Sequence, residues 1–304
     1  MLRLGKQKCC FSYRSLSFFH GHQRFYKSSF GPLFFAGGVA GVSFLVASIL
    51  DYEKRKKMYE NRGSIRGIFN NLKSSFNTSR SSTPSILQDV KDVFNRMTAG
   101  DKTAWTIIVA NTAVFLLWQF PSMQSTMLKH FTSTINSPSY TLLTSVFSHN
   151  APIHLFFNMM AVHSFVPMLV DQVMGVEQFT AMYLTSGVVS ALGSRIVRAM
   201  IGYNTYSLGA SGALFGLLGF LSHSSTMQVS VFFFGPFPLS NVFWASMAFD
   251  AFSLVFRNSL GWDHAAHLAG GMFGVLYFRV LKPMVWDRRM EMLEKIGYKG
   301  YKNK

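Results

Sequence analysis

Residues 31–50 read GPLFFAGGVAGVSFLVASIL, a stretch without a charged residue. About 20 consecutive apolar residues are enough for a helix to cross the hydrocarbon layer of a bilayer, so this stretch predicts a transmembrane helix. Similar apolar runs follow it, and they are continuous rather than alternating, which favours helices over the strands of a barrel. We expect six further spans, at about 104–120, 152–170, 178–198, 208–225, 237–256 and 261–281.

The composition supports a membrane protein. Of 304 residues, 49% are hydrophobic and 14% are charged, whereas a soluble domain carries about 25% charged residues. The predicted fold class is an all-α, polytopic membrane helix bundle, with one N-terminal span at 31–50 and a six-span core at 104–281.

The net charge of +16 comes from basic residues that cluster in 1–30, 51–103 and 279–304. Basic flanks on apolar spans are typical of topology control and of contact with lipid head groups, whereas nucleic-acid binding favours a basic face on a folded domain. We therefore expect the lipid bilayer as a partner and no nucleic acid. The only cysteines are the adjacent Cys9 and Cys10, which excludes a cysteine zinc site in the rest of the chain.

The segments outside the core differ in composition. Residues 1–30 contain Arg, Lys and Ser but no acid, which is typical of a mitochondrial targeting leader; a disordered basic tail is the alternative. Residues 51–103 are a polar connector, in which 86–97 has one apolar helical face and predicts a surface helix. Residues 282–304 form a basic C-terminal tail.

Three segments begin the second, fourth and sixth core spans. They are Ser148 to Met159, Gly209 to Ala213, and Asp263 to Gly271. Because consecutive spans alternate in direction, these three starts lie at the same face of the membrane. Ionisable side chains inside spans are costly and are functional candidates by default.

The chemistry of these segments suggests a hydrolase. A serine hydroxyl needs a neighbouring base before it attacks, and His267 is placed to supply one for Ser211. Ser211 begins a helix and is flanked by Gly209 and Gly212, so that backbone can approach a substrate closely. The N-terminus of this helix also points its amides toward developing negative charge. A lone serine in a membrane helix would more often bond its own helix or pack against a small neighbour.

Two further side chains share one helix face. His154 and Asn158 are separated by four residues, and together they offer donors for an oxyanion hole. We expect His149 to bond the long loop before the second core span. No Gly-x-Ser-x-Gly elbow is present, since residue 213 is Ala.

Other ionisable groups leave alternatives open. Asp263 lies four residues before His267 and is a candidate triad acid. His264 suggests a zinc or proton-relay pair with His267, although the absence of HExxH disfavours a zinc metalloprotease. Asp250 is a lone acid in the fifth core span, where it either marks a hydrated cavity or bonds a neighbouring helix.

The three segments, in this order on these spans, resemble the rhomboid intramembrane serine proteases, and the leader with its extra span resembles their mitochondrial, presenilin-associated rhomboid-like branch. The resemblance implies a Ser–His dyad without an acid, formed by Ser211 and His267. It also implies an oxyanion hole of His154, Asn158 and the Ser211 amide, and an aromatic packing position at Phe215.

The expected function is therefore that of an intramembrane serine endopeptidase of the mitochondrial inner membrane, acting on single-pass membrane proteins without a cofactor or metal. The alternatives are a non-proteolytic rhomboid-like protein that binds membrane clients, or a helix-bundle transporter, although no inverted repeat is visible. The charge distribution places the basic face of the six-span core in the matrix, and with seven spans this puts the N-terminus in the intermembrane space. The leader and the resemblance instead place the N-terminus in the matrix and the C-terminus in the intermembrane space. We expect this second orientation. The sequence predicts no oligomeric state.

Overall fold

The structure is a computed structural model and describes residues 21–62, 86–202, 205–231, 234–256 and 262–298. Residues 1–20 of the predicted leader and 63–85 of the connector lie outside the described residues. The elements in chain order are α1 (Gly21–Arg62), α3 (Ile86–Arg96), α4 (Ala99–Trp118), η1 (Pro121–Met123), α5 (Gln124–His130), α6 (Thr141–Thr144), η2 (Ser145–Phe147), α7 (Pro152–Met168), η3 (Leu169–Met174), α8 (Gly175–Ile201), α9 (Ser211–Ser224), β1 (Gln228–Val231), β2 (Phe234–Pro238), α10 (Leu239–Val255), α11 (His264–Leu276), η4 (Tyr277–Trp286) and α12 (Arg289–Lys295).

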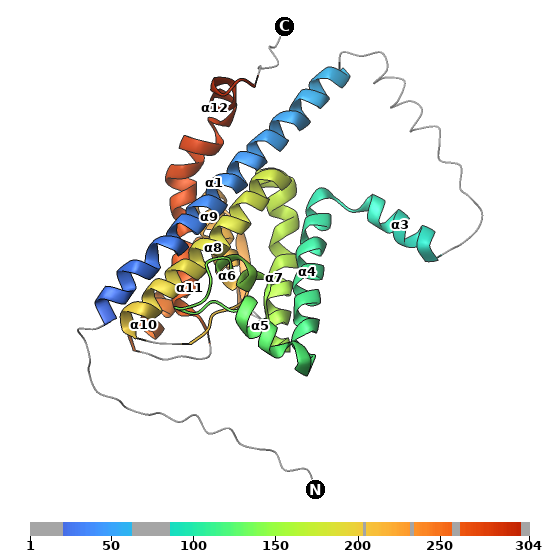
Figure 1. The fold of residues 1–304 in the computed structure, drawn as a ribbon. Coiled ribbons are helices and arrows are strands. Elements are labelled where there is room, and N and C mark those ends of the chain that lie inside the picture. Colours follow the sequence, from blue (N-terminus) through green and yellow to red (C-terminus); the bar gives the residue numbers. More distant parts are fainter. Residues whose placement is uncertain (1–20, 63–85, 203–204, 232–233, 257–261, 299–304) are drawn as a thin grey trace.

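The predicted all-α membrane bundle is confirmed (Figure 1). Helices α4, α7, α8, α9, α10 and α11 form the core, and α1 lies alongside it. Within the described residues, three helical stretches are long and apolar enough to cross a membrane: Phe30–Glu60, Pro152–Ile201 and His264–Lys295. The second of these contains both α7 and α8. They are two separate spans, because the chain turns at Gly175, where φ is +76°.

The remaining core spans are bent or short. Helix α4 and the following Pro121–His130 segment are together apolar enough to span, with a 97° bend between them. Helix α10 is apolar but has 17 residues, and α9 has 14. At 1.5 Å per residue α9 is about 21 Å long, shorter than the hydrocarbon layer of about 30 Å. Helix α9 can be this short because its neighbours bury it on most sides.

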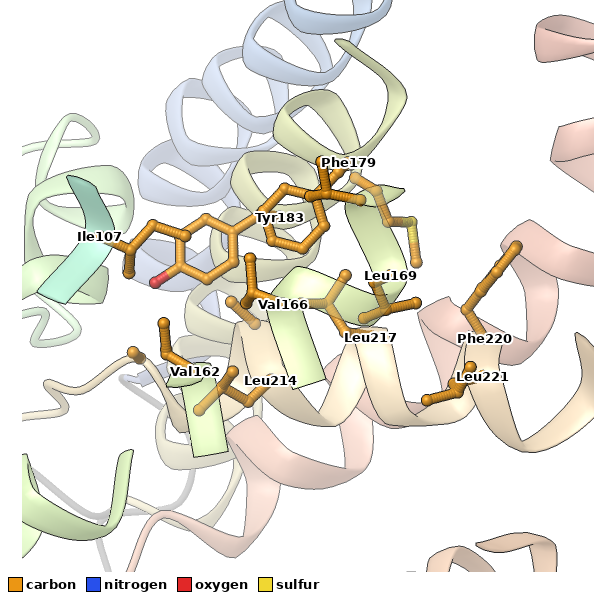
Figure 2. Close-up of a cluster of buried hydrophobic side chains, with 14 of the residues drawn as sticks. Ile107, Val162, Val166, Leu169, Phe179, Tyr183, Leu214, Leu217, Phe220 and Leu221 are labelled. Carbon is orange, nitrogen blue, oxygen red and sulfur yellow. The ribbon is translucent and has the colours of Figure 1, made fainter. Parts of the chain in front are cut away.

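The apolar core surrounds α9 (Figure 2). Leu217 and Leu221 of α9 pack among side chains from α7, η3 and α8, and all of these are almost completely buried. The labelled members of this cluster are Ile107, Val162, Val166, Leu169, Phe179, Tyr183, Leu214, Leu217, Phe220 and Leu221. Burial of this kind contributes about 1.5–3 kcal/mol for each large apolar side chain in a soluble core. Between membrane helices, close packing takes over much of that role.

Glycines bring α9 and α11 into direct backbone contact. A Cβ on Gly270 would collide with the carbonyl oxygen of Gly212, and a Cβ on Gly274 would collide with that of Gly216. Small residues at a helix interface allow this approach. Since Ser211 begins α9 and His267 lies in the first turn of α11, the same contact sets the spacing between the two side chains.

Helix α1 extends well beyond the predicted span at 31–50. Its apolar part packs on α8, where Ala36 lies near Val188 and Ala47 near Ala181. Phe44 stacks on Tyr277 with ring centroids 5.3 Å apart. At Gly37 and Gly41 of α1, by contrast, no atom of the described residues lies within 4 Å of where a Cβ would stand.

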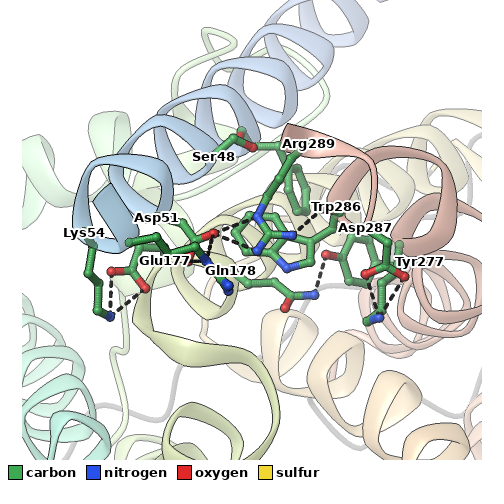
Figure 3. A network of polar contacts seen from close by, with 12 residues as sticks. Ser48, Asp51, Lys54, Glu177, Gln178, Tyr277, Trp286, Asp287 and Arg289 are labelled. Atoms are coloured by element: carbon green, nitrogen blue, oxygen red, sulfur yellow. Dashed lines mark hydrogen bonds and ion pairs between the residues drawn. The ribbon is translucent and has the colours of Figure 1, made fainter. Parts of the chain in front are cut away.

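A polar network fixes the C-terminal half of α1 to the core (Figure 3). Lys54 forms an ion pair with Glu177 at the start of α8, with the atoms 3.0 Å apart. The buried carboxylate of Asp51 accepts hydrogen bonds from Arg55 and from Arg289, and the Arg289 guanidinium lies 2.7 Å away. These partners explain why the helix continues through the charged residues 53–57, which the sequence analysis assigned to the connector.

The structure adds a two-stranded antiparallel hairpin that the sequence analysis did not predict. Strands β1 and β2 pair Gln228 with Pro238 and Val231 with Phe234, with an irregularity between Val229 and Val231. The hairpin joins α9 to α10. Helix α3, by contrast, occupies Ile86–Arg96, where the apolar periodicity predicted a surface helix.

Candidate active site

Ser211 is the first residue of α9, and the loop before it is held in one conformation. Gly209 has φ +125°, a region that side chains other than glycine rarely adopt. A Cβ at this position would also stand 2.7 Å from Cε1 of His154. Glycine is therefore required at 209 for two separate reasons, backbone conformation and contact with the imidazole.

Hydrogen bonds from the preceding loop fix the backbone on both sides of Gly209. The N–H of Gly209 donates to the carbonyl of Ser145 at 2.9 Å. The N–H of Ala210 donates to Nε2 of His149 at 3.4 Å. Ser133 and Ser207 exchange backbone hydrogen bonds at 2.9 Å. The loop at 131–149 thus holds the residues that lead into Ser211.

His149 contributes as a neutral acceptor. Burial, together with the nearby imidazole of His154, lowers the pKa of His149 to about 3. The ring therefore stays neutral at physiological pH, with Nε2 free to accept the Ala210 N–H. The bond of His149 is to Ala210, in the loop before α9, and not within the long loop before the second core span, where the sequence placed it.

Ser211 and His267 meet in the structure. Nε2 of His267 lies 2.9 Å from Oγ of Ser211, a hydrogen-bond distance. The ring of Phe215, one helical turn beyond Ser211, stacks on His267 with centroids 4.3 Å apart and an interplanar angle of 12°. The stack fixes the plane of the imidazole, and the helix contact between α9 and α11 fixes its distance from Ser211.

Asp250 of α10 is the partner of His267 that the sequence analysis did not assign. Its carboxylate oxygens lie 3.2 and 3.3 Å from Nδ1 of His267, and Oδ1 lies 2.5 Å from Nδ1 of His264. A carboxylate only accepts hydrogen bonds, so both imidazoles donate to it through Nδ1. The sequence left Asp250 as either a cavity marker or a link to a neighbouring helix. The structure shows the link to α11, and Asp250 also lines an apolar cavity.

Asp263 does not serve as the acid beside His267. It is the N-cap of α11 and accepts from the Ala266 N–H at 3.1 Å. The same carboxylate accepts a hydrogen bond from the hydroxyl of Ser194. The spacing of four residues from His267 is therefore misleading, because a residue in the N-cap position turns its side chain toward the first backbone amides of the helix.

The proposed oxyanion-hole residues lie on α7, close to the loop before Ser211. His154 packs edge-on against His149, with centroids 4.9 Å apart, and contacts Gly209. Asn158 is buried, and its Nδ2 donates to the carbonyl of His154 at 2.9 Å. An amide nitrogen carries two N–H donors, so this bond leaves the other available. Asn158 and Ser211, both among the described residues, form no direct hydrogen bond with each other.

An apolar cavity of about 610 Å³ leads to the histidine. One face of α10 forms its length, through residues such as Val242, Ala245 and Phe249. Phe234 and Phe237 of β2 also line it, together with His267, Phe215 and Asp250. The volume is of the size that binds a segment of several side chains.

The cluster of Asp250, His264 and His267 also consists of groups that bind metals. Two imidazoles and one carboxylate form a common catalytic zinc set, and here one ligand atom from each lies within 4.8 Å of the others. The hydrogen bonds from both Nδ1 atoms already pair the two imidazoles with the carboxylate without an ion. The buried Nε2 of His264 has no hydrogen-bond partner among the described residues.

Comparison with known proteins agrees with the geometry. The rhomboid domain model matches residues 136–283. The mitochondrial presenilin-associated rhomboid-like protein of Homo sapiens is 33% identical over 282 residues, covering 90% of this chain and 71% of that protein. Its Bos taurus counterpart is 33% identical over 277 residues, covering 88% and 70%.

The mitochondrial rhomboid protein 1 of Saccharomyces cerevisiae is 35% identical over 207 residues, covering 64% of this chain and 57% of the yeast protein. Because the human protein is 33% identical and this chain covers 71% of it, the chain belongs to the rhomboid family. The resemblance that the three sequence motifs indicated is thereby confirmed.

Proposed function

We propose that the protein is an intramembrane serine endopeptidase in which Ser211 is the nucleophile and His267 the general base. The observation that carries the proposal is the 2.9 Å separation between Nε2 of His267 and Oγ of Ser211. A base at hydrogen-bond distance from a serine hydroxyl is the arrangement that nucleophilic catalysis needs. The apolar surroundings suit a reaction inside a bilayer.

The mechanism follows from the positions of the atoms. His267 takes the Ser211 proton on Nε2 as Oγ attacks the scissile carbonyl carbon. The resulting oxyanion is stabilised by the N-terminal amides of α9 and by donors from His154 and Asn158. His267 then returns the proton to the leaving amine, and water releases the acyl group by the reverse sequence.

We propose transmembrane segments as the substrate class, with the cavity along α10 as their binding site. A fully hydrogen-bonded helix hides its peptide bonds, so a segment that unwinds readily inside the bilayer is preferred. The aromatic and aliphatic lining between Phe237 and Phe249 supports an apolar occupant. Single-pass membrane proteins present such a segment without neighbouring helices.

Purified protein in liposomes, with a single-pass substrate carrying a Gly/Ser/Pro-rich segment, tests the proposal. We expect cleavage by the wild type and none by Ser211→Ala or His267→Ala. Because the two residues act as a unit, the double variant is expected to be no slower than either single variant. Binding of the substrate without cleavage by the wild type would favour the client-binding alternative.

We propose the mitochondrial inner membrane as the location, supported by the basic, acid-free residues 1–30 and by relatives that are named mitochondrial. Deleting residues 1–27 is expected to prevent import. With the N-terminus in the matrix, a C-terminal tag is expected to be digested by protease added to mitoplasts. Import of the truncated protein, or a tag that survives until the inner membrane is lysed, would contradict these two expectations.

A further inference from the structure

We propose that Asp250 is a positioning residue for His267, holding its ring in the tautomer that can act as a base. The proposal rests on the proposed function, and it makes the fifth core helix, α10, the source of a third member of the Ser211–His267 site. The motifs on the second, fourth and sixth core spans do not include this residue.

The geometry defines the tautomer. Nδ1 of His267 lies 3.2 Å from one carboxylate oxygen of Asp250 and 3.3 Å from the other. Since the carboxylate accepts, Nδ1 carries the ring proton. The opposite nitrogen, Nε2, then has a free lone pair, and this is the atom that faces Ser211 at 2.9 Å.

His264 orients the carboxylate. Its Nδ1 donates to Oδ1 of Asp250 at 2.5 Å, so Oδ2, at 3.2 Å from Nδ1 of His267, is the oxygen that His264 leaves free for that ring. His264 is itself held between the rings of Phe249 and Trp262, with centroids 5.9 and 6.3 Å away. Two imidazole donors satisfy a carboxylate that is only 2% exposed, and a buried carboxylate without such donors is strongly unfavourable.

Packing of α10 on the core does not itself require a carboxylate. Phe243 and Met247 of α10 already pack on Val275 and against Gly271 of α11. An acid in a membrane helix is costly, so its presence beside the histidine calls for a role. Phe215 fixes the plane of the His267 ring by stacking, but stacking leaves both rotation within that plane and the tautomer free. Asp250 fixes these two.

The same contact stabilises the charge that develops during the reaction. When the proton of Ser211 moves from Oγ to Nε2 as the Oγ–carbon bond forms, His267 becomes a cation with a proton on each nitrogen. Nδ1–H then donates to an anionic carboxylate in surroundings of low dielectric constant, which favours the charged pair. Asp250 remains unprotonated throughout, and the proton passes from Nε2 to the leaving amine.

Asp250→Asn tests the proposal. Because His264 holds the Oδ1 position, the amide nitrogen of Asn falls opposite Nδ1 of His267 and forces the ring proton onto Nε2. Removing the acid of a soluble serine-protease triad lowers turnover by about 10⁴-fold. Here we expect kcat for the liposome substrate to fall by at least about 100-fold, with KM close to that of the wild type.

The matched control is Asp171→Asn. Asp171 accepts the Gly100 N–H at 2.8 Å and links η3 to α4 beyond the far end of α7. This variant also replaces an interhelical carboxylate with an amide, and we expect wild-type kcat. Thermal unfolding of both variants separates lost folding from lost chemistry.

A spectroscopic readout does not depend on activity. In wild-type protein carrying ¹⁵N-labelled histidine, we expect His267, assigned through its loss in His267→Asn, to be protonated on Nδ1 at neutral pH. In Asp250→Asn the proton is expected on Nε2. A wild-type ring protonated on Nε2, or wild-type kcat in Asp250→Asn, would overturn the proposal.

Two other results separate this proposal from its alternatives. If the wild type shows Nδ1 protonation but cleaves no substrate, the proposed function fails while the positioning geometry stands. If chelation abolishes wild-type activity and zinc restores it, the cluster of Asp250, His264 and His267 binds a metal, and the positioning role is overturned.

Discussion

Gly209 lies directly against the imidazole of His154, so closely that a Cβ at residue 209 would stand 2.7 Å from Cε1 of that ring. The contact joins the loop before α9 to the first turn of α7. It couples the conformation of the residues leading to Ser211 with the position of a candidate oxyanion donor.

Gly209→Ala is expected to lower the rate of substrate cleavage by about 100-fold, the effect of losing one oxyanion donor, because the new Cβ displaces His154. Gly202→Ala is the matched control, since Gly202 also has a positive φ, +69°, but among the described residues no atom lies within 4 Å of where its Cβ would stand. Both variants carry backbone strain of about 1–3 kcal/mol. Equal cleavage rates in the two would show that the contact with His154 is irrelevant to the reaction.

Asn158→Ala and His154→Ala are each expected to reduce kcat by about 100- to 1000-fold without abolishing it. The reason is that the remaining donors and the α9 amides still stabilise part of the oxyanion charge. Ser164→Ala provides a control on the same helix, because Ser164 is exposed and bonds only the Met160 carbonyl among the described residues. Wild-type kcat in both Asn158→Ala and His154→Ala would make those residues structural.

Gly274→Ala is expected to destabilise the protein by about 1–3 kcal/mol, because the added methyl group forces α11 away from α9. Gly38→Ala, where no described atom lies within 4 Å of the added Cβ, is instead expected to stabilise the protein by about 0.5–1 kcal/mol through helix propensity. Thermal unfolding in detergent measures both. A gain in stability from Gly274→Ala would refute the close contact.

Asp51→Ala is expected to cost about 3–5 kcal/mol, since it leaves the mostly buried Arg289 guanidinium without its carboxylate. The control is Asp287→Ala, which breaks the exposed pair with Lys282 and is expected to cost at most about 1 kcal/mol. Limited proteolysis within residues 51–62 reports whether α1 has detached. Equal shifts in unfolding temperature would mean that the network at Asp51 does not hold α1.

Much of the fold and the pairing of Ser211 with His267 could be predicted from the sequence. Length and hydropathy of the runs identify the spans, and alternation of direction brings the starts of the even core spans to one face. The glycines after His267 indicate a close helix contact. Each of these signals is local, within one span or its boundary.

Asp250 could not be assigned in the same way, because its partners lie 14 and 17 residues away on another helix. Contact between them depends on the rotation of α10 about its axis, which hydropathy does not determine when the whole helix is apolar. The signal that could have found it is the acid itself inside a span. Asp263 is the converse case: its spacing from His267 made it a candidate triad acid, but its N-cap position directs its carboxylate to the Ala266 N–H.

The length of α1 and the hairpin after α9 also depend on distant contacts. The charged residues after Leu50 favour a connector when considered alone, and they remain helical because Lys54 meets Glu177 and Asp51 meets Arg289. The aromatic run before α10 forms β2 only because β1 pairs with it.

The most direct test of the central claim, that His267 activates Ser211, is mass-spectrometric mapping of a fluorophosphonate adduct on the purified protein in liposomes. We predict a single modification on Ser211 in the wild type, and none in Ser211→Ala or His267→Ala variants that remain folded. A wild-type protein that cleaves substrate but carries no adduct on Ser211, or a His267→Ala variant labelled at the wild-type rate, would contradict the account.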